Sequence, residues 1–585
     1  MPGWFQKLFT RDQTHFLDLT KHFFRQFFEN EFISRGSEAR LGVVHVLAML
    51  PLPGIFYTFY IIPTYDDIRL FLPWQFHAVS LIDQSRYVTF SMIVIGIIAI
   101  LEWDALFLDR RDYAVLGPLP LKGPAVFAAK VTSLLLFLSL FIFDVGGIPT
   151  LMYPLVESTG ISGPQVSFLR LSRMVLAHAI AVLGGSVFIF LFFVAIQGIL
   201  INFLGPRAFK IVSRCFQLQA IVALLLFLFL LPITSAGLPA WEQARDPGLF
   251  WVPPLWFVGV YQTLLGSGDA VFHSLAKIAI VALGLVTLAC AAGYGISYKR
   301  QAQRALEAAE ARTDEPFWPA RATRWVLNAF VLRKPHERAT YFFVVNTLVR
   351  STKHRLYLAT YIGVGCALAA FGILEVLARS VRRDFSALLF RPSEALLAIP
   401  LILSFFLLSG MRVVFTIPAE LHANWVFQLA EDESWLDCCS GARKAMVLRA
   451  VLLLLLLFPF YAFLWGWLVG FQHLVFGLML SLILVEVLLM NFRKVPFTCS
   501  YQPGKAYITV LGVFYWLAFT TYAYTMATLE RWLLRDAVRW IVLVVFTLVV
   551  LGGLILRRKT RLAHGLGLIY EDEPNPDVQT LGLSA

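Results

Sequence analysis

Few residue patterns in this chain could perform catalysis. The phosphate-binding loop GxxxxGK[ST] does not occur in the sequence. The most similar string, Cys499–Ala506, has Lys505 followed by Ala506 where a Ser or Thr would coordinate magnesium. The sequence also lacks the GxSxG turn of serine hydrolases and the HExxH helix of zinc proteases. We therefore predict no catalytic residues and do not expect an enzyme.

The six cysteines do not form a recognisable metal or disulfide framework. None belongs to a CxxC pair or has the His spacing that holds zinc. Cys438 and Cys439 are adjacent and could be a redox or metal handle, but we interpret them as small apolar residues on a cytoplasmic segment. The sequence thus predicts no metal site.

Ionisable residues inside apolar stretches are the remaining candidates for chemistry. A charge at the centre of a membrane helix costs about 2.5–3.5 kcal/mol on insertion scales, so it usually faces a pathway or a partner. The sequence offers Asp144, His178, Lys277, Glu375, Arg412 and Glu486. We select Glu375, Arg412 and Glu486 as candidate pathway residues. For Arg412 and Glu486, pairing between helices is an equally open interpretation.

The elements that must position these residues are membrane helices. Of the 585 residues, 58% are hydrophobic and 15% are charged, and the apolar residues come in long blocks. A lipid core cannot satisfy an open backbone, so such blocks form helices. We predict an all-α polytopic bundle of about twelve spans: 41–62, 88–103, 125–145, 174–203, 215–234, 274–297, 356–378, 394–418, 447–466, 474–491, 506–527 and 540–556.

The basic residues indicate an orientation. The net charge is +12, and most of the 49 Lys and Arg residues flank apolar blocks, which is typical of membrane topology rather than of nucleic-acid binding. With a cytoplasmic N-terminus, most of them fall on the cytoplasmic side. The positive-inside rule therefore predicts a multi-pass protein of the cytoplasmic (inner) membrane with both termini in the cytoplasm.

The chain divides into two halves with a similar layout. We predict a first six-span half at 1–297, a cytoplasmic linker at 298–340, and a second six-span half at 341–585 with a cytoplasmic tail. Each half opens with an amphipathic helix expected to lie in the membrane interface, marked by Phe16, Leu19 and Phe23 in the first and by Tyr341 and Phe342 in the second. The alternative is that any twelve-span chain can be cut into six and six.

Each half also carries a polar cytoplasmic segment after its second span. The first runs from Glu102 to Lys130, and its candidate residues are Asp109, Arg110, Arg111, Asp112, Tyr113, Leu119, Pro120, Lys122 and Lys130. Prolines and a glycine make it short and stiff. The second runs from Ile417 to Met446, and its candidate residues are Trp425, Glu431, Asp432, Trp435, Arg443 and Lys444.

Leu119, Pro120 and Lys130 stand in a Leu-Pro-(x)n-Lys pattern, and here the sequence resembles the membrane-spanning permease subunits of ABC-type exporters. The resemblance implies that the segment docks on a separate ATPase, which would bind ATP and magnesium, while this chain binds no cofactor. It also implies that one chain, with two permease units, acts as a pseudo-dimer. The stretch at 253–266 is similar to the re-entrant helices of such permeases.

The second half departs from the family pattern. Its polar segment lacks the Leu-Pro step, and its last external loop, near 529–539, is short. The competing hypothesis is a secondary transporter with two repeats, driven by an ion gradient. That class should place broken helices and polar residues at matching positions of both halves.

Overall fold

The computed structural model of the chain is helical. It describes residues 16–26, 47, 49–103, 106, 123–158, 167–307, 324–380, 392–419, 431–490, 492, 495–498, 515–534 and 537–563, and these residues contain helices and no strand. Ten helices among them are long and apolar enough to cross a membrane, which indicates a multi-pass membrane protein. The predicted spans at 41–62 and 506–527 are not among the ten and lie partly outside the described residues, so twelve spans remain a prediction.

The chain separates into two compact units, residues 1–313 and 314–585. Unit 1 begins with a helix over residues 16–26. It continues with these helices: α3 (Leu52–Phe71), α4 (Phe76–Leu101), α6 (Gly123–Ser158), α7 (Phe168–Phe203), α8 (Pro206–Ala236), α9 (Leu238–Ala244), α10 (Pro253–Leu265) and α11 (Ala270–Glu307). Helix α4 packs against α6, α7, α8 and α10, and is therefore central to the unit.

The short helix α10 is part of the interior of unit 1. It packs against α4, α7 and α11, and its Phe257, Val258 and Tyr261 are buried. Helices α10 and α11 approach each other closely at Gly259, where a Cβ added to the glycine would lie 2.5 Å from Leu275 Cβ on α11. The stretch at 253–266 thus forms a helix, and Gly259 allows this helix to pack closely against α11 because glycine has no side chain.

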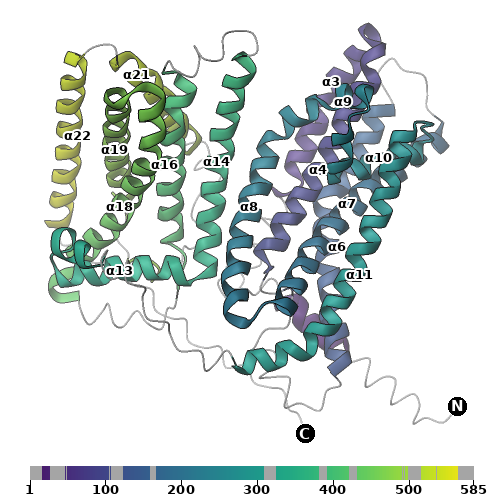
Figure 1. Ribbon diagram of the computed structural model, residues 1–585, viewed down its shortest axis with the longest axis horizontal. Helices are drawn as coiled ribbons and strands as arrows, with labels where there is room; N and C mark the ends of the chain where they lie inside the picture. The colour runs from purple at the N-terminus through teal and green to yellow at the C-terminus, as the bar shows by residue number, and fades with distance from the viewer. Residues whose placement is uncertain are drawn as a thin grey trace. The chain divides into compact units, whose positions relative to one another are not determined.

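Unit 2 is also built of helices. Its helices are α13 (Pro335–Arg350), α14 (Thr352–Ser380), α16 (Glu394–Val414), α18 (Glu431–Trp465), α19 (Trp467–Leu489), a helix at 515–520 that continues through the π-helix η6 (Thr521–Thr525) into α21 (Met526–Leu533), and α22 (Ala537–Ala563). Helix α16 packs against α14, α18, α19, η6 and α21. Within this unit, α13 runs across the ends of the long helices rather than alongside them (Figure 1).

Several helices extend beyond the predicted spans. Helix α4 begins at Phe76, whereas the span was predicted to start at 88, and α6 continues to Ser158 beyond a predicted end at 145. The added parts contain Asp83, Gln84 and Glu157, which are buried and hydrogen-bonded. A hydropathy window ends where polar residues begin, but a helix continues as long as those residues find partners inside the bundle.

Candidate functional site

The segment that joins α4 to α6 is the principal site predicted from the sequence. Most of its candidate residues lie outside the described residues: Asp109, Arg110, Arg111, Asp112, Tyr113, Leu119, Pro120 and Lys122. The structure does describe how the segment begins. Trp103 is buried, its indole Nε1 donates to Ser213 Oγ on α8 at 2.9 Å, and its carbonyl accepts from Gln197 Nε2 on α7 at 2.8 Å. The segment therefore starts from a point fixed to two long helices.

Lys130, the last candidate in this segment, is buried with 2% of its surface exposed. Its Nζ lies 4.9 Å from the ring centre of Phe23 and donates to Gln26 Oε1 at 3.2 Å. Phe23 packs in turn on Val126 and Ala129 of α6. The side chain thus faces the amphipathic helix at 16–26 and helps to fix that helix to the beginning of α6. A sequence pattern gives chain position but not the direction in which a side chain points.

The second polar segment leads directly into α18. Trp425 lies outside the described residues, and Glu431, Asp432 and Trp435 belong to the first turns of α18, where the helix is described but their side chains are not. Lys444 forms an ion pair with Glu337 of α13 and donates to the carbonyl of Val331 at 2.6 Å. A lysine of the third long helix, Lys130 in α6 and Lys444 in α18, therefore holds the amphipathic helix in each unit.

Gly441 brings α13 and α18 into backbone contact. A Cβ at this position would lie 2.5 Å from the carbonyl oxygen of Glu337 and 3.1 Å from the amide nitrogen of Tyr341. Burial raises the pKa of the Tyr341 hydroxyl, which stays protonated in this contact. The lysine pair and the close approach together make α13 and the first part of α18 one packed structure.

Changing Gly441 to Val should separate these two helices. Overpacking a tight contact costs about 1–3 kcal/mol, and here the clash is with backbone that cannot move aside. We expect a lower thermal midpoint of unfolding for the purified protein. Gly284→Val on α11 is the matched control, because nothing lies within 4 Å of a Cβ placed there. Equal midpoints for the two variants would contradict the contact.

Arg443 and Glu486 meet in an ion-pair cluster that joins three helices. Glu486 on α19 accepts from Arg443 Nη1 of α18 at 2.7 Å and from Arg558 Nη1 of α22 at 3.0 Å. Glu486, a candidate pathway residue, thus has the interhelical pairing that was the other interpretation. Arg412 donates from Nε to the carbonyl of Leu488 at 3.0 Å, and its guanidinium lies 4.4 Å from the ring centre of Phe492.

The third pathway candidate, Glu375, belongs to α14, but its side chain lies outside the described part of the structure. The structure therefore brings Glu486 together with two basic residues and Arg412 together with backbone and an aromatic ring. Their predicted role in a pathway stays a prediction.

A buried polar cluster in unit 1 was missed by the sequence analysis. Glu157 of α6 accepts hydrogen bonds from Ser80 and Gln84 of α4, the latter at 2.9 Å, and from Tyr261 Oη of α10 at 2.6 Å. Gln84 Oε1 also accepts from Gln262 Nε2 at 2.7 Å. Burial, with Glu157 adjacent, raises the pKa of the Tyr261 hydroxyl, so Tyr261 remains a donor.

A second part of this polar cluster surrounds Asp83. Its carboxylate accepts from the hydroxyl of Tyr57 on α3, and Arg86 lies 3.4 Å away. Arg86 donates to Tyr57 Oη at 2.7 Å and to Ser235 Oγ of α8 at 2.8 Å. The cluster ties α3, α4, α6, α8 and α10 together. Asp83 and Gln84 precede the predicted span 88–103 and Glu157 follows the predicted span 125–145, so none of them is a charged or polar residue inside a predicted span.

Unit 2 contains a second missed group, the buried pair His473 and Glu530. His473 Nδ1 on α19 and Glu530 Oε1 on α21 are 2.7 Å apart, and their side chains are 3% and 0% exposed. Glu530 had been placed in an external loop near 529–539, but α21 carries it into the bundle. The apolar residues Met526, Leu529 and Leu533 are three and four residues apart, and this spacing is the signal for an amphipathic helix.

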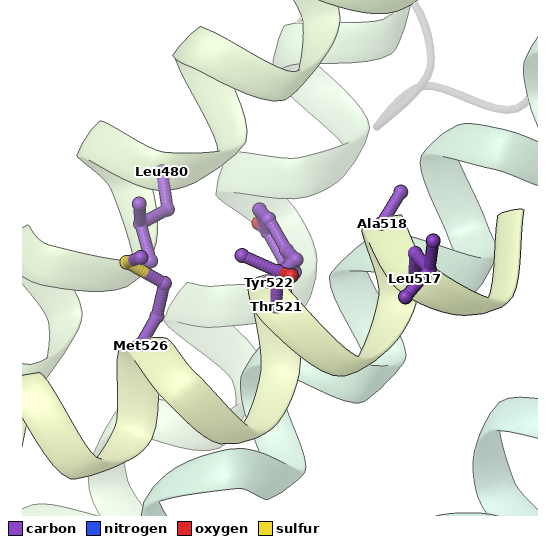
Figure 2. A pocket seen from close by; sticks show the side chains of 6 residues that line it. All are labelled: Leu480, Leu517, Ala518, Thr521, Tyr522 and Met526. Carbon is purple, nitrogen blue, oxygen red and sulfur yellow. The ribbon is translucent and has the colours of Figure 1, made fainter. Parts of the chain in front are cut away.

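The described residues also form an open groove of about 400 Å³ in unit 2. Figure 2 shows its lining, which comes from α19 and from the stretch that includes η6: Leu480, Leu517, Ala518, Thr521, Tyr522 and Met526. The lining is mostly apolar, and the Tyr522 hydroxyl lies 3.1 Å from Ser404 Oγ. Such a groove suits an apolar chain and offers no charged group to recognise a headgroup.

Within the described ranges, no group of three or more His, Cys, Asp or Glu residues is arranged to hold a metal ion, and Cys215, Cys290, Cys366 and Cys439 form no disulfide. Comparisons with known protein families, with curated proteins and with solved structures found no match to this chain.

Proposed function

We propose that the chain is the transmembrane permease component of an ABC-type export system, driven by a separate ATPase subunit that binds ATP and magnesium. The ten apolar helices support a multi-pass membrane protein. We further propose a location in the cytoplasmic membrane with both termini in the cytoplasm, on the distribution of basic residues. The two units would together replace a permease dimer.

One observation carries this proposal. In both units a short amphipathic helix is fixed to the third long helix, through Lys130 of α6 in one and Lys444 of α18 in the other. The polar segment therefore has firm structure on its far side. A docking segment can move a membrane helix only if the two are rigidly connected.

The near side of each polar segment is also anchored. In unit 1, Trp103 is bonded to α7 and α8. In unit 2, the carbonyl of Ile417 lies 3.0 Å from His354 Nε2 of α14, and the amide of Ala419 donates to the carbonyl of Phe497 at 2.9 Å. Force applied to either segment would then displace several long helices instead of bending a loop.

The alternative is a secondary transporter driven by an ion gradient. Its support is that each unit buries a carboxylate within its bundle, Glu157 in unit 1 and Glu530 in unit 2. Buried acids in membrane helices often bind the coupling ion. The alternative expects transport by the purified chain alone, whereas the permease hypothesis requires the second subunit.

Co-purification separates the two hypotheses. The tagged chain, expressed in its native host, should bring down a subunit that hydrolyses ATP. Replacing Arg110, Arg111 and Leu119 with Ala in one variant should lower the recovered ATPase activity at least about tenfold. The variant loses two charge-assisted contacts and one apolar contact, and a total loss of about 1.4 kcal/mol in binding free energy lowers the affinity tenfold.

The matched control replaces Arg300, Arg304 and Leu306 in the predicted linker, which has the same residue types. It should retain the ATPase activity. Gradient-driven uptake by the pure chain, or labelling of a cysteine at position 113 from the external side, would overturn the proposal and favour the alternative.

A further inference from the structure

The pair of His473 and Glu530 has the geometry of a proton-binding site. Helix α19 carries the imidazole and α21 the carboxyl group, and the two meet at 2.7 Å with almost no exposure. We propose that this pair binds one proton and is neutral as a whole, with Glu530 as a carboxylic acid hydrogen-bonded to a neutral imidazole. Neither the predicted docking segments nor the candidate pathway residues include this pair, so the inference is independent of the proposed function.

The surroundings of the two groups favour the neutral form. Among the described residues, Glu530 Oε2 and His473 Nε2 have no hydrogen-bond partner. A buried ionised carboxylate needs several donors, and an imidazolium has two N–H groups to satisfy. The imidazole ring packs on Tyr461 and Trp465, with ring centres 4.6 and 5.8 Å away. Burial raises the pKa of Glu530, an effect that His473 only partly opposes.

The other charges near α21 do not compensate an ionised Glu530. On α21 itself, Arg531 faces outward and pairs with Glu394 of α16 at 3.0 Å, both about half exposed. Arg539 of α22 donates to the carbonyl of Trp532 and lies over its ring. Tyr461 of α18 donates to the carbonyl of Leu396, and Tyr522 of η6 lies next to Ser404. His473 is thus the one titratable group bonded to Glu530 in the described structure.

Unit 1 has a related cluster at the corresponding place in its order of helices. Tyr153 on α6 is in the position of Tyr461 on α18, and its ring centre lies 5.1 Å from the ring centre of His178 on α7. The ring centre of Tyr261, on the short helix α10 before the last long helix, lies 5.6 Å from the centre of the same imidazole. Here, however, the carboxylate Glu157 accepts from Ser80, Gln84 and Tyr261 rather than from the histidine. The similar positions of the histidine and the two tyrosines support a repeat. Only in unit 2 is the histidine bonded to the carboxyl group, so we place the proton-binding pair there.

Binding of the proton is linked to the docking of α21. Loss of the proton would leave an uncompensated carboxylate in a buried site, and gain of a second would leave an uncompensated imidazolium there. Either change favours entry of water and separation of α21 from α19. The pair should therefore keep a single proton across a wide range of pH for as long as α21 is packed in place.

Infrared spectroscopy of the purified full-length chain in lipid nanodiscs tests this inference. At neutral pH the wild type should show the C=O stretch of a buried carboxylic acid, shifted in D2O, that is missing in Glu530→Gln. Glu394→Gln should leave the band unchanged, because that carboxylate is half exposed and ion-paired. The absence of any band difference between wild type and Glu530→Gln would mean that Glu530 is ionised, and would overturn the proposal.

The variant His473→Gln adds an independent measurement. Without the imidazole, burial still disfavours an ionised carboxylate, so the same band should persist at neutral pH. Loss of the band in this variant at neutral pH would equally overturn the proposal. If either variant is recovered aggregated, the titration of the wild-type band decides alone: a band that persists from acid through neutral pH supports the site, and disappearance at the pH of an exposed carboxyl group refutes it.

Discussion

Replacing Glu157 with Leu should lower the free energy of unfolding by about 3 kcal/mol or more, because three buried donors lose their acceptor at about 1–3 kcal/mol each. Ser80, Gln84 and Tyr261 all donate to this carboxylate, which links α4, α6 and α10. The apolar replacement fills the space but accepts no hydrogen bond. Thermal or denaturant unfolding of the purified protein, followed by near-UV circular dichroism, measures the loss.

Two controls define the cause. Glu157→Gln keeps one carbonyl oxygen as an acceptor, so it should cost less than half as much as the leucine variant. Glu242→Gln removes a carboxylate from α9 whose partner His77 is 58% exposed, so its effect should stay below about 1 kcal/mol. If Glu157→Leu were as stable as the wild type, the polar cluster would not hold unit 1 together.

Neutralising Glu486 is expected to have the second large effect. Glu486→Gln leaves Arg443 and Arg558 without a counter-charge at the junction of α18, α19 and α22. Removing one partner of a fully buried pair costs about 3–5 kcal/mol. The side chains of Arg443 and Arg558 are 25% and 32% exposed, so solvent screens part of their repulsion. We therefore expect Glu486→Gln to lower the free energy of unfolding by about 2 kcal/mol. A lower thermal midpoint at low ionic strength is the measurement.

The exposed pair Arg531 and Glu394 is the matched control for this variant. Both side chains are about half exposed, so Glu394→Gln should shift stability by less than about 1 kcal/mol. Glu486→Asp keeps the negative charge on a shorter side chain, so it should lose less stability than Glu486→Gln. A variant Glu486→Gln with wild-type stability would return the residue to a pathway role.

The all-helical membrane architecture could be predicted from the sequence because lipid exposure imposes long apolar stretches. Each of the ten long helices overlaps a predicted span, from 88–103 with α4 to 540–556 with α22. Their ends could not be predicted. Asp83 and Glu157 extend helices that a hydropathy window cuts short, because their partners come from other parts of the chain. Hydropathy measures residues one segment at a time and contains no information on such pairing.

The site residues show the same division. The sequence placed Lys130 and Lys444 in the two polar segments, and in the structure both belong to long helices, Lys130 to α6 and Lys444 to α18. Their orientation toward the amphipathic helices depends on tertiary packing, as at Phe23 and Glu337. His473 and Glu530 are 57 residues apart. Only the fold brings them together, so no local pattern could indicate the pair.

The wide turn η6 determines which way the residues after it point. Thr521–Thr525 forms a π-helix, which accommodates one more residue than an α-helical turn of the same stretch. In an α-helix each residue advances the rotation about the axis by about 100°. Removing a single amino acid here would turn the whole of Met526–Leu533 by that angle and direct Glu530 away from His473. The acid–base pair therefore depends on how many residues precede it as much as on which residues they are, and a chain with the same side chains but one residue fewer in this turn would lack it.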